Sequence, residues 1–328
     1  MVQMKVSVIV TVLNERASIG ALLASLAAQT RPPDEIVVVD GGSTDGTMDV
    51  IASYLDKLPL KLLFKSGTNI SQGRNEAIRS AAGEIIASTD AGTRLVPEWL
   101  AELAAPIERG EAAVTAGFFL PDPQSAFETA LGATTLPELR DVEPGKFMPS
   151  SRSVAFRKSA WEAVGGYPEW LDYCEDLVFD FALDEQFGPF AFAPGAIARF
   201  RPRPTLGAFA KQYYRYARGD GKADLWRMRQ AARYGTYLVA VPLIFVGGLL
   251  LHPAVWLLYL LGAAAMFAKP YRRLVPWLRG MSRSQRFKAL AWVPVIRVMG
   301  DWAKMAGYPA GVWWRFKNRK SIPPHLRR

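Results

Sequence analysis

The chain has 328 residues, 50% of them hydrophobic, which is enough for one large domain or two smaller ones with a substantial core. Its single cysteine, Cys174, excludes an internal disulfide and suits a reducing compartment. The net charge of +10 is compatible with a nucleic acid, an anionic membrane surface or a phosphorylated substrate as partner. The basic residues form no nucleic-acid-binding signature and many flank an apolar segment, so we expect a membrane and no nucleic acid as partner.

The first 120 residues alternate between short β-branched runs and helical stretches, a pattern typical of βαβ units. The first apolar run, residues 6–13, is too short for the core of a signal peptide, so we expect a buried first strand and no signal peptide. The pattern predicts an α/β, Rossmann-like domain with a mostly parallel sheet and flanking helices. Strands are expected at residues 6–10, 35–40, 60–64 and 84–90, and helices at residues 17–29, 47–55 and 72–82.

Residues 120–150 are rich in Pro, Gly and Thr and show no clear period, which predicts a long loop region. A strand is expected at residues 153–156, followed by a helix at 159–164 and a Gly-Gly-Tyr-Pro turn from Gly165.

Residues 234–268 carry no formal charge and exceed the roughly 20 residues that one membrane span requires. His252 and Pro253 lie in the middle, which favours a hairpin of two short helices; one kinked span and a buried hairpin of a soluble protein are the alternatives. Basic residues lie on both sides, so the positive-inside rule predicts a cytoplasmic membrane protein with both termini in the cytoplasm.

Residues 287–316 form another apolar stretch, but they include Arg297, Asp301 and Lys304 at helical spacing. Charges are costly within a span, whereas a helix with apolar, aromatic and basic residues suits the membrane interface. We therefore expect an interfacial or re-entrant segment here, followed by a basic tail, 315–328, at the anionic leaflet. The predicted division is a cytoplasmic domain at 1–225 and a C-terminal α-helical membrane region at 226–328.

Two apolar runs each end in an aspartate, Asp40 and Asp90, at the point where a strand should leave the sheet. Ligands of open α/β sheets bind at the carboxyl ends of strands. The carboxylate of Asp40 could accept a hydrogen bond from a nucleotide base or ribose, and the glycines after it would let the backbone approach the ligand. A purely structural turn is the alternative for Asp40-Gly-Gly-Ser.

Arg74 is expected near the start of a helix at the same edge of the sheet, where a guanidinium can pair with a diphosphate. The alternative is a solvated surface arginine. The dinucleotide fingerprint and the Walker P-loop are both absent from the sequence.

In order and spacing, these motifs resemble the family 2 glycosyltransferases of the GT-A fold. The resemblance covers residues 4–220 and rests on the Val-Leu-Asn-Glu opening, Val-Val-Val-Asp-Gly-Gly-Ser-Thr-Asp-Gly-Thr at 37–47, Gly-Arg-Asn at 73–75, Ala-Gly-Glu-Ile-Ile with the following Asp90, and Gly-Gly-Tyr-Pro-Glu before Cys174-Glu175-Asp176. It implies an inverting enzyme that moves a sugar from a nucleoside-diphosphate sugar to an acceptor hydroxyl. Inversion needs a general base and a stabilised diphosphate leaving group.

The resemblance implies that Asp176 is the catalytic base, with Glu175 as the less favoured candidate. Asp40 matches the acid that recognises the base, and Asp90 matches the first acid of an Asp-x-Asp metal motif for Mg²⁺ or Mn²⁺. The residues expected at the nucleotide-sugar are Thr11, Asn14, Glu15, Asp40, Gly42, Ser43, Arg74, Asp90, Gln212 and Arg215.

The chain departs from the family pattern at two positions. The metal motif reads Asp90-Ala91-Gly92 and lacks its second carboxylate, so dependence on a divalent cation is in question, and basic residues could carry more of the leaving-group charge. Gln212 to Tyr216 resembles the Gln-x-x-Arg-Trp element of processive synthases, with tyrosine in place of tryptophan. An amphipathic interface helix is the alternative reading of that element.

We therefore expect a membrane-anchored glycosyltransferase whose acceptor is a lipid-linked or membrane-proximal glycan, as in the synthesis of cell-envelope polysaccharide. Two alternatives stay open at this point. One is a polyprenyl-phosphate glycosyltransferase, and the other is a non-catalytic GT-A scaffold.

Overall fold

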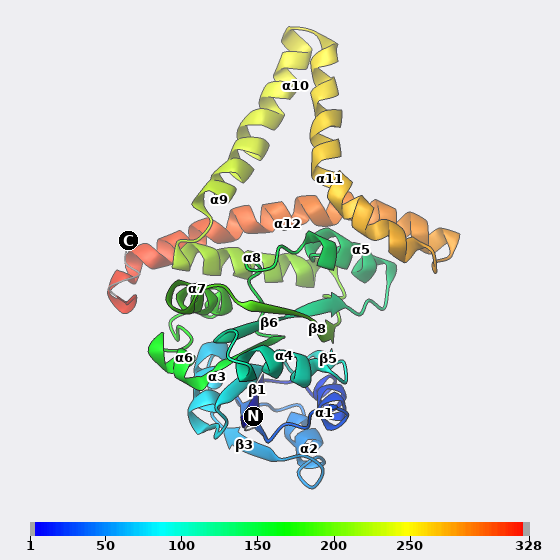
Figure 1. The fold of residues 1–328 in the computed structure, drawn as a ribbon. Helices are drawn as coiled ribbons and strands as arrows, with labels where there is room; N and C mark the ends of the chain where they lie inside the picture. The colour runs from blue at the N-terminus through cyan, green and yellow to red at the C-terminus, as the bar shows by residue number, and fades with distance from the viewer. Residues whose placement is uncertain (1–3, 324–328) are drawn as a thin grey trace. The chain divides into compact units, whose positions relative to one another are not determined.

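The computed structural model describes residues 4–323 and divides into two compact units (Figure 1). The first unit contains the residues up to Asp122 together with Leu139–Arg201. The second contains Pro123–Glu138 and the residues from Pro202 onward. The predicted boundary between residues 225 and 226 stays a prediction.

The described residues of the first unit form an eight-stranded sheet in the order β3-β2-β1-β4-β7-β6-β8-β5. Strands β1 to β4 are parallel to one another, whereas β7 runs antiparallel between β4 and β6. The predicted strands and the mixed, mostly parallel sheet are thus confirmed. The strands are β1 (Val6–Val12), β2 (Glu35–Asp40), β3 (Leu60–Phe64), β4 (Ile85–Ser88), β5 (Thr93–Leu95), β6 (Val114–Pro121), β7 (Val154–Arg157) and β8 (Ala191–Phe200).

Helices cover both faces of this sheet because its central strands are apolar on both sides. Side chains alternate along β1, so that Val8 and Val10 join one core while Ile9 joins the other. The first core is covered by α1 (Ile19–Ala27), α2 (Thr47–Ala52) and α4 (Trp99–Glu108), and the second by α3 (Ile70–Ser80), α6 (Lys158–Ala163) and α7 (Glu175–Phe187).

The prediction of a long loop at residues 120–150 was wrong, because this region contains helix α5 (Ala126–Thr135) and a short 3-10 turn, Leu139–Asp141. Ser125 caps α5 by accepting a hydrogen bond from the N–H of Glu128. The hydroxyl groups of Thr134 and Thr135 donate to carbonyl oxygens four residues earlier. One side of α5 is buried in an apolar cluster, which stabilises a helix that composition alone disfavours.

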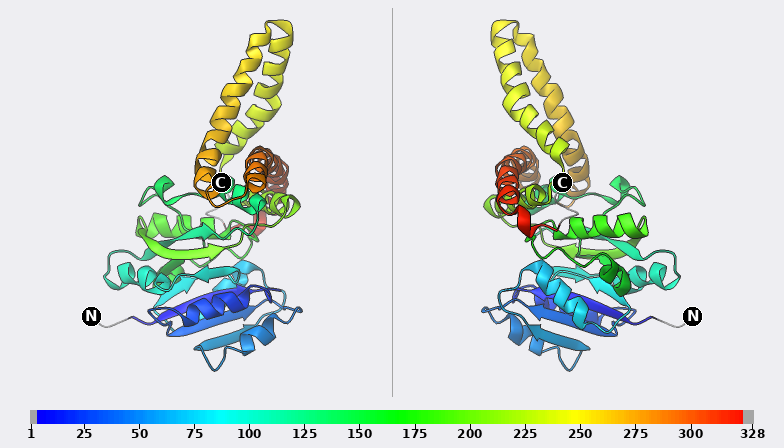
Figure 2. Two further views of the ribbon diagram at one scale, coloured as in Figure 1. Left: turned by 90° about the vertical axis from the view of Figure 1, so that its right-hand side faces the viewer. Right: turned by 90° about the vertical axis from the view of Figure 1, so that its left-hand side faces the viewer.

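The predicted helical hairpin is present in the second unit (Figure 2). Its two arms, Arg227–Leu250 and Pro253–Leu278, are each long and apolar enough to cross a membrane, and only 6% of each apolar window is buried. The alternative of a buried hairpin therefore does not hold for the described residues. The first arm contains α9 (Arg227–Tyr234), a π-helical segment (Gly235–Ala240) and α10 (Val241–Leu250); the second contains a 3-10 turn (Pro253–Trp256) and α11 (Leu257–Leu278).

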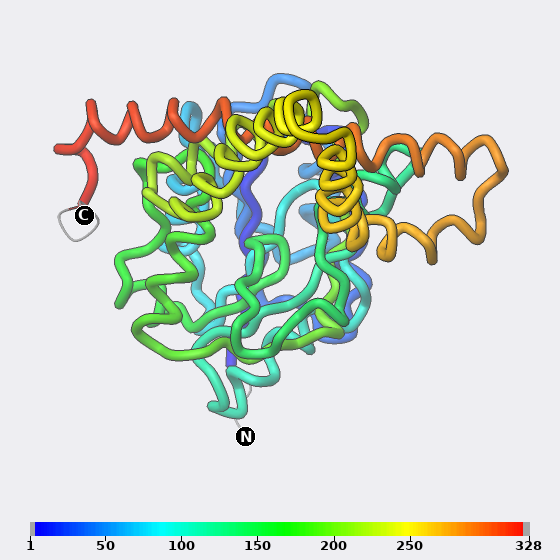
Figure 3. The backbone as a smooth tube through the Cα atoms, turned by 90° about the horizontal axis from the view of Figure 1, so that it is seen from above, coloured from blue at the N-terminus to red at the C-terminus, as the bar shows by residue number. Residues whose placement is uncertain are grey.

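Helices α8 (Leu206–Ala223) and α12 (Arg283–Lys317) pack side by side in the same direction (Figure 1), and Figure 3 shows α12 running toward the C-terminus. Glycines of α12 allow this contact: a Cβ on Gly307 would collide with the carbonyl oxygen of Tyr214, and one on Gly311 with that of Arg218. The two backbones are therefore in direct contact.

The charged residues predicted on one face of α12 are turned toward the second unit's own helices. Asp301 is buried and pairs with Arg233 of α9 at 2.7 Å and with Arg297 at 3.6 Å. Trp313 and Phe316 are exposed on other faces of α12. The predicted basic tail is described as far as residue 323, and its residues 324–328 lie outside the described part of the chain.

Candidate active site

The predicted site residues of the first unit gather where β1, β2 and β4 end. In the order β3-β2-β1-β4, strand β1 pairs in parallel with both neighbours, and the chain connections leave it in opposite directions. Such a switch point opens a crevice at the carboxyl ends of the strands. Asp40 is the last residue of β2, and Asp90 follows β4 by two residues.

The loops after β1 and β2 are tied together by predicted nucleotide-binding residues. The N–H of Asn14 donates to the Ser43 hydroxyl at 2.9 Å, and the Asn14 side-chain oxygen accepts from the N–H of Thr44 at 2.9 Å. Asn14 has a φ of 56°, a left-handed conformation that asparagine tolerates better than most residues. The side chain of Asn14 is therefore an integral part of the loop pair.

Asp40 is fully buried, and its carboxylate stabilises the loop that follows β2. Both of its carboxylate oxygens accept from the N–H of Ser43 at 3.1 Å, and the Ser43 hydroxyl donates to one of them. Gly42 has a φ of 106° in this turn, where a Cβ would also approach the Ser66 hydroxyl to 2.9 Å. The structural turn that sequence left open for this motif is thus present, and base recognition by Asp40 stays a prediction.

Glu15 begins the segment that leads to α1. Its N–H donates to the Thr47 hydroxyl at 2.8 Å, and its carboxylate accepts from the Ser18 hydroxyl. Glu15 therefore lies next to the Asn14–Ser43 loops, and its place beside the nucleoside stays a prediction.

Helix α3 starts at the same edge of the sheet and places the side chain of Arg74 in the candidate site. Asn69 and Gln72 form a capping box that ends the preceding loop. Gly73 lies so close to β1 that a Cβ would stand 2.9 Å from Thr11 Cγ2. Thr11 thus contacts the first turn of α3, and the absence of a side chain at position 73 allows the close approach.

Arg74 joins two predicted acids. Its Nη1 lies 2.7 Å from Glu175 Oε1 and its Nη2 lies 3.0 Å from Asp90 Oδ1. The Arg74 side chain is only 4% exposed, so the solvated arginine considered from sequence is excluded. Burial alone would lower the pKa of Arg74, but Glu175 and Asp90 raise it, and the guanidinium stays charged.

The two adjacent acids at the start of α7 have different surroundings. Glu175 is buried against Arg74, and burial, followed by the neighbouring Asp176, raises the pKa of Glu175 to about 7. Asp176 is partly exposed, and its carboxylate accepts from the N–H of Leu177 at 2.9 Å. Cys174 precedes them with a φ of 64°, so that the chain turns sharply into the helix.

A further acid, Asp180, lies one turn along α7 from Asp176. It is buried, and burial raises its pKa well above the usual range. Its Oδ2 has no hydrogen-bond partner among the described residues. Burial thus distinguishes Asp180 from Asp176, which is partly exposed at the start of the helix.

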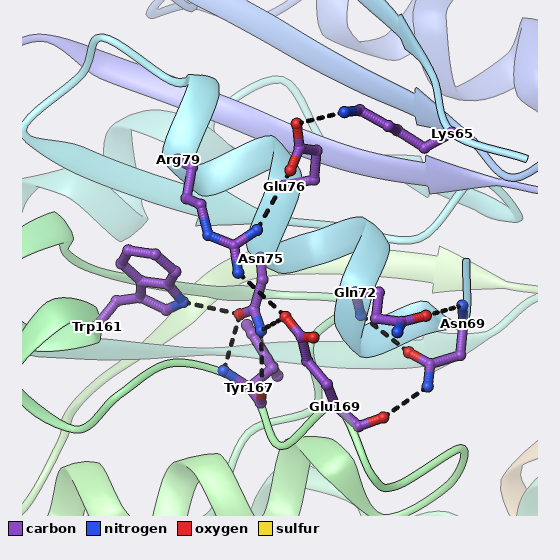
Figure 4. Close-up of polar contacts among 9 residues, drawn as sticks. All are labelled: Lys65, Asn69, Gln72, Asn75, Glu76, Arg79, Trp161, Tyr167 and Glu169. Carbon is purple, nitrogen blue, oxygen red and sulfur yellow. Dashed lines mark hydrogen bonds and ion pairs between the residues drawn. The ribbon is translucent and has the colours of Figure 1, made fainter. Parts of the chain in front are cut away.

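Asn75 is a site residue whose role the sequence analysis missed (Figure 4). Its amide donates to the Tyr167 carbonyl and to Glu169 Oε1, and its oxygen accepts from Trp161 Nε1 and from the N–H of Tyr167. A Cβ on Gly166 would lie 2.8 Å from the Asn75 oxygen. The Gly-Gly-Tyr-Pro-Glu motif is therefore the loop that closes over Asn75.

This loop in turn supports Arg74. The Tyr167 ring stacks on Phe179 of α7 with a centroid separation of 4.1 Å, and the Arg74 guanidinium carbon lies 5.3 Å from the centre of the Tyr167 ring. Tyr167 thus holds α3 and α7 at a fixed separation beside the ion pairs.

Arg152, which belongs to no motif recognised in the sequence, also contacts Asp90. Its Nε lies 3.3 Å from Asp90 Oδ2, whereas Arg74 pairs with Oδ1 of the same carboxylate. Residue 152 precedes β7, whose Val154 pairs with Ser88 at the end of β4. The only sequence signal was a basic residue just before an expected strand.

Gln212 and Arg215 belong to α8 of the second unit. Gln212 Nε2 donates to the Tyr216 hydroxyl at 2.7 Å, one helical turn away. The Tyr213 ring packs on Phe209 at 4.3 Å. The structure brings together the predicted residues of the first unit, whereas a role of Gln212 and Arg215 at the nucleotide-sugar stays a prediction.

The residues around Asp90 do not fit a divalent cation held by the protein. Both carboxylate oxygens of Asp90 face guanidinium groups, and Gly92 supplies no second carboxylate. No group of three or more His, Cys, Asp and Glu side chains within the described residues could hold a metal ion. Mg²⁺ and Mn²⁺ prefer oxygen ligands, and these would have to be taken from arginine pairs.

Comparison with known proteins agrees with this geometry. Residues 85–301 match the family model "Glycosyl transferase family group 2", and residues 7–161 match "Glycosyl transferase family 2". The validoxylamine A glucosyltransferase of Streptomyces hygroscopicus subsp. limoneus is 36% identical over 103 residues, which are 30% of this chain and only 23% of that protein. The succinoglycan biosynthesis protein ExoA of Rhizobium meliloti is 28% identical over 76% of this chain and 79% of its own length.

Among solved structures, the chain is similar to the mannosyltransferase PcManGT of Pyrobaculum calidifontis, which was determined in complex with GDP-Man and Mn²⁺. The TM-score is 0.57 at 19% sequence identity, and the match covers 97% of this chain and 88% of that one. This likeness shows that the two proteins share a fold. The chain therefore belongs to the glycosyl transferase family group 2 and has the GT-A fold.

Proposed function

We propose that this enzyme transfers a sugar, with inversion, from a nucleoside-diphosphate sugar to a hydroxyl of a lipid-linked or membrane-proximal glycan. The observation that carries the proposal is the group of Arg74, Asp90 and Glu175 with Asp176 beside it. It combines a partly exposed carboxylate with fixed positive charge at the switch point of the sheet. Those are the two parts that inverting transfer needs.

Asp176 acts as the general base. It is partly exposed and its neighbour Glu175 is buried against Arg74, so Asp176 is the acid that an acceptor hydroxyl can reach. As the acceptor oxygen attacks the anomeric carbon, its proton passes to Asp176. The bond from that carbon to the diphosphate oxygen breaks, and the electron pair leaves with the nucleoside diphosphate.

The nucleoside is held by the loops after β1 and β2. Asn14, Gly42 and Ser43 lie at the surface of these loops. The buried carboxylate of Asp40 holds the second loop in place through its hydrogen bonds with Ser43. Thr11 and Glu15 lie beside them. A divalent cation at Asp90 is not part of the proposal, because both oxygens of that carboxylate face guanidinium groups.

The second unit anchors the enzyme to a membrane. Its two long apolar helices have apolar windows that are almost wholly exposed. The exposed Trp302, Trp313 and Phe316 of α12 suit a helix in the interface, with its charges turned inward. A membrane location favours an acceptor at the bilayer, such as an intermediate of a cell-envelope polysaccharide.

The proposal is tested with detergent-purified protein and a panel of labelled UDP-, GDP- and dTDP-sugars, offered with extracted membrane lipids as acceptors. We expect label from one donor to enter the lipid fraction. Asp176→Asn should lower this transfer by at least about 100-fold, within the usual range for loss of a general base, and leave donor binding intact. Asp184→Asn, on the same helix two turns further on, is the matched control.

Two outcomes would contradict parts of this proposal. Full transfer by Asp176→Asn would point to an acceptor that needs no base, such as a polyprenyl phosphate. Donor binding without hydrolysis or transfer, for every donor and lipid extract, would point to a scaffold without catalytic function.

A further inference from the structure

Asp90 lies between two guanidinium groups of unequal accessibility. Arg74 is 4% exposed and is already engaged by Glu175, so it cannot leave its place without exposing a buried acid. Arg152 is 23% exposed and Asp90 is 29% exposed. A ligand that enters at this edge of the sheet would therefore meet Arg152.

The Arg152 side chain is held in place from two further directions. Its guanidinium carbon lies 4.5 Å from the centre of the Phe200 ring, and its Nη1 donates to the Ser150 hydroxyl at 3.3 Å. Stacking on an aromatic face keeps the guanidinium plane in position while its N–H groups can still bind at the edges. Asp90, which contacts Nε, fixes the orientation of that plane.

The position that would supply a second acid for a cation lies open. Gly92 is exposed, and a Cβ built on it would meet no atom within 4 Å. A carboxylate is therefore absent from residue 92 for reasons other than lack of room. The two oxygens of Asp90, which a metal ion would need as ligands, are instead paired with the guanidinium groups of Arg74 and Arg152.

We propose that Arg152 binds the diphosphate of the donor and takes up the charge of the leaving group, so that the enzyme needs no divalent cation at Asp90. This rests on the proposed function. As the anomeric carbon–oxygen bond breaks, negative charge grows on the diphosphate, and Arg152 stabilises it with charge-assisted hydrogen bonds. Asp90 is a positioning residue that orients Arg152, and Arg74 holds Asp90 in place.

The test measures equilibrium binding of UDP, GDP and dTDP, and of the matching nucleosides, to the full-length protein in detergent. Each titration is run with EDTA and again with Mn²⁺. We expect wild-type protein to bind one nucleoside diphosphate in EDTA. Arg152→Gln should weaken that binding by about 10-fold or more, as expected for loss of a charge-assisted hydrogen bond, and should leave nucleoside binding unchanged.

Two variants sharpen the comparison. Arg152→Lys keeps the charge but loses the planar fork, so its affinity should lie between those of wild type and Arg152→Gln. Arg109→Gln removes an exposed arginine that pairs with Glu111 beyond the end of α4, and it should bind like wild type. An unchanged nucleoside affinity shows that the Arg152 variants are folded.

The inference is overturned if Arg152→Gln binds the nucleoside diphosphate as tightly as wild type does. It is also overturned if wild-type binding disappears in EDTA and returns with Mn²⁺. If wild-type protein binds none of the three nucleoside diphosphates under either condition, the proposed function itself is wrong.

Discussion

Arg74 and Glu175 are 101 residues apart in sequence, and their side chains meet at 2.7 Å inside the first unit. The pair links α3 to the start of α7, and Arg74 extends the link to Asp90. One buried cation thus sets the relative positions of an acid at the sheet edge and of the proposed catalytic base next to Glu175.

Replacing Arg74 by methionine should destabilise the protein strongly. The substitution leaves Glu175 buried without its partner, and loss of one member of a buried ion pair typically costs about 3–5 kcal/mol. Protonation of Glu175 would lessen the cost at low pH. Denaturant unfolding of the variant and of the wild type measures this loss in the free energy of unfolding. Arg79→Gln, on the exposed side of the same helix, should change stability by less than about 1 kcal/mol. Equal effects of the two substitutions would argue against a structural role of the buried pair.

The raised pKa of Glu175 makes stability depend on pH. Burial raises this pKa from 4.5 to about 7, so the folded protein keeps a proton that the unfolded chain has lost. The free energy of unfolding should therefore fall as the pH rises through that interval and level off above it. Asp180, with its pKa also raised by burial, acts in the same direction.

Thermal unfolding between about pH 4.5 and pH 8 measures this dependence. Glu175→Gln should flatten the slope, since glutamine does not titrate, whereas Glu185→Gln at an exposed position of α7 should keep it. A slope that is unchanged in Glu175→Gln would assign the pH dependence to other groups.

Substitution by alanine should have opposite effects on stability at a glycine in the contact between α8 and α12 and at a glycine outside it. Gly311→Ala should destabilise the second unit, because the new methyl group collides with the Arg218 carbonyl oxygen and neither backbone can move aside easily. Gly262→Ala, on α11 where no atom lies within 4 Å, should stabilise its helix by up to about 1 kcal/mol. Melting temperatures of both variants in one detergent check the contrast. A stable Gly311→Ala protein would show that the two helices are separable.

Gly92→Asp should create dependence on a metal ion. The added carboxylate has room and would supply the acid that the Asp-x-Asp motif otherwise contains. Mn²⁺ should then raise the affinity for a nucleoside diphosphate by about 10-fold, equivalent to roughly 1.4 kcal/mol, with a much smaller effect on wild type. Gly92→Asn has nearly the same shape without the charge and serves as the control. The same Mn²⁺ effect in both variants would rule out the carboxylate as its cause.

The sequence predicted those parts of the fold that depend on local pattern. The parallel strands around β1 were evident because their buried runs are apolar and end at Asp40 and Asp90. Helix α5 was missed because its stability comes from packing against α11 and α12, more than 100 residues away. The composition of residues 126–135 alone does not predict that contact.

The same distinction applies to the candidate site. Family motifs identified Arg74, Asp90 and Glu175, and the structure joins them. They did not identify Arg152, whose importance depends on meeting Asp90 from a loop 62 residues later in the chain. Nor did they show that Arg74 is paired on both sides, since pairing across 101 residues is a property of the folded chain alone.

The hydrogen bonds of Asn75 limit which amino acids position 75 can accept. Its side chain donates twice and accepts twice, and each of the four bonds goes to a different group of the Trp161–Glu169 segment. Aspartate lacks the donors, leucine lacks both kinds of group, and glutamine is longer by one methylene. Saturation mutagenesis of position 75, read out by protein yield, should therefore recover asparagine almost alone, while Arg79 one turn away accepts most residues.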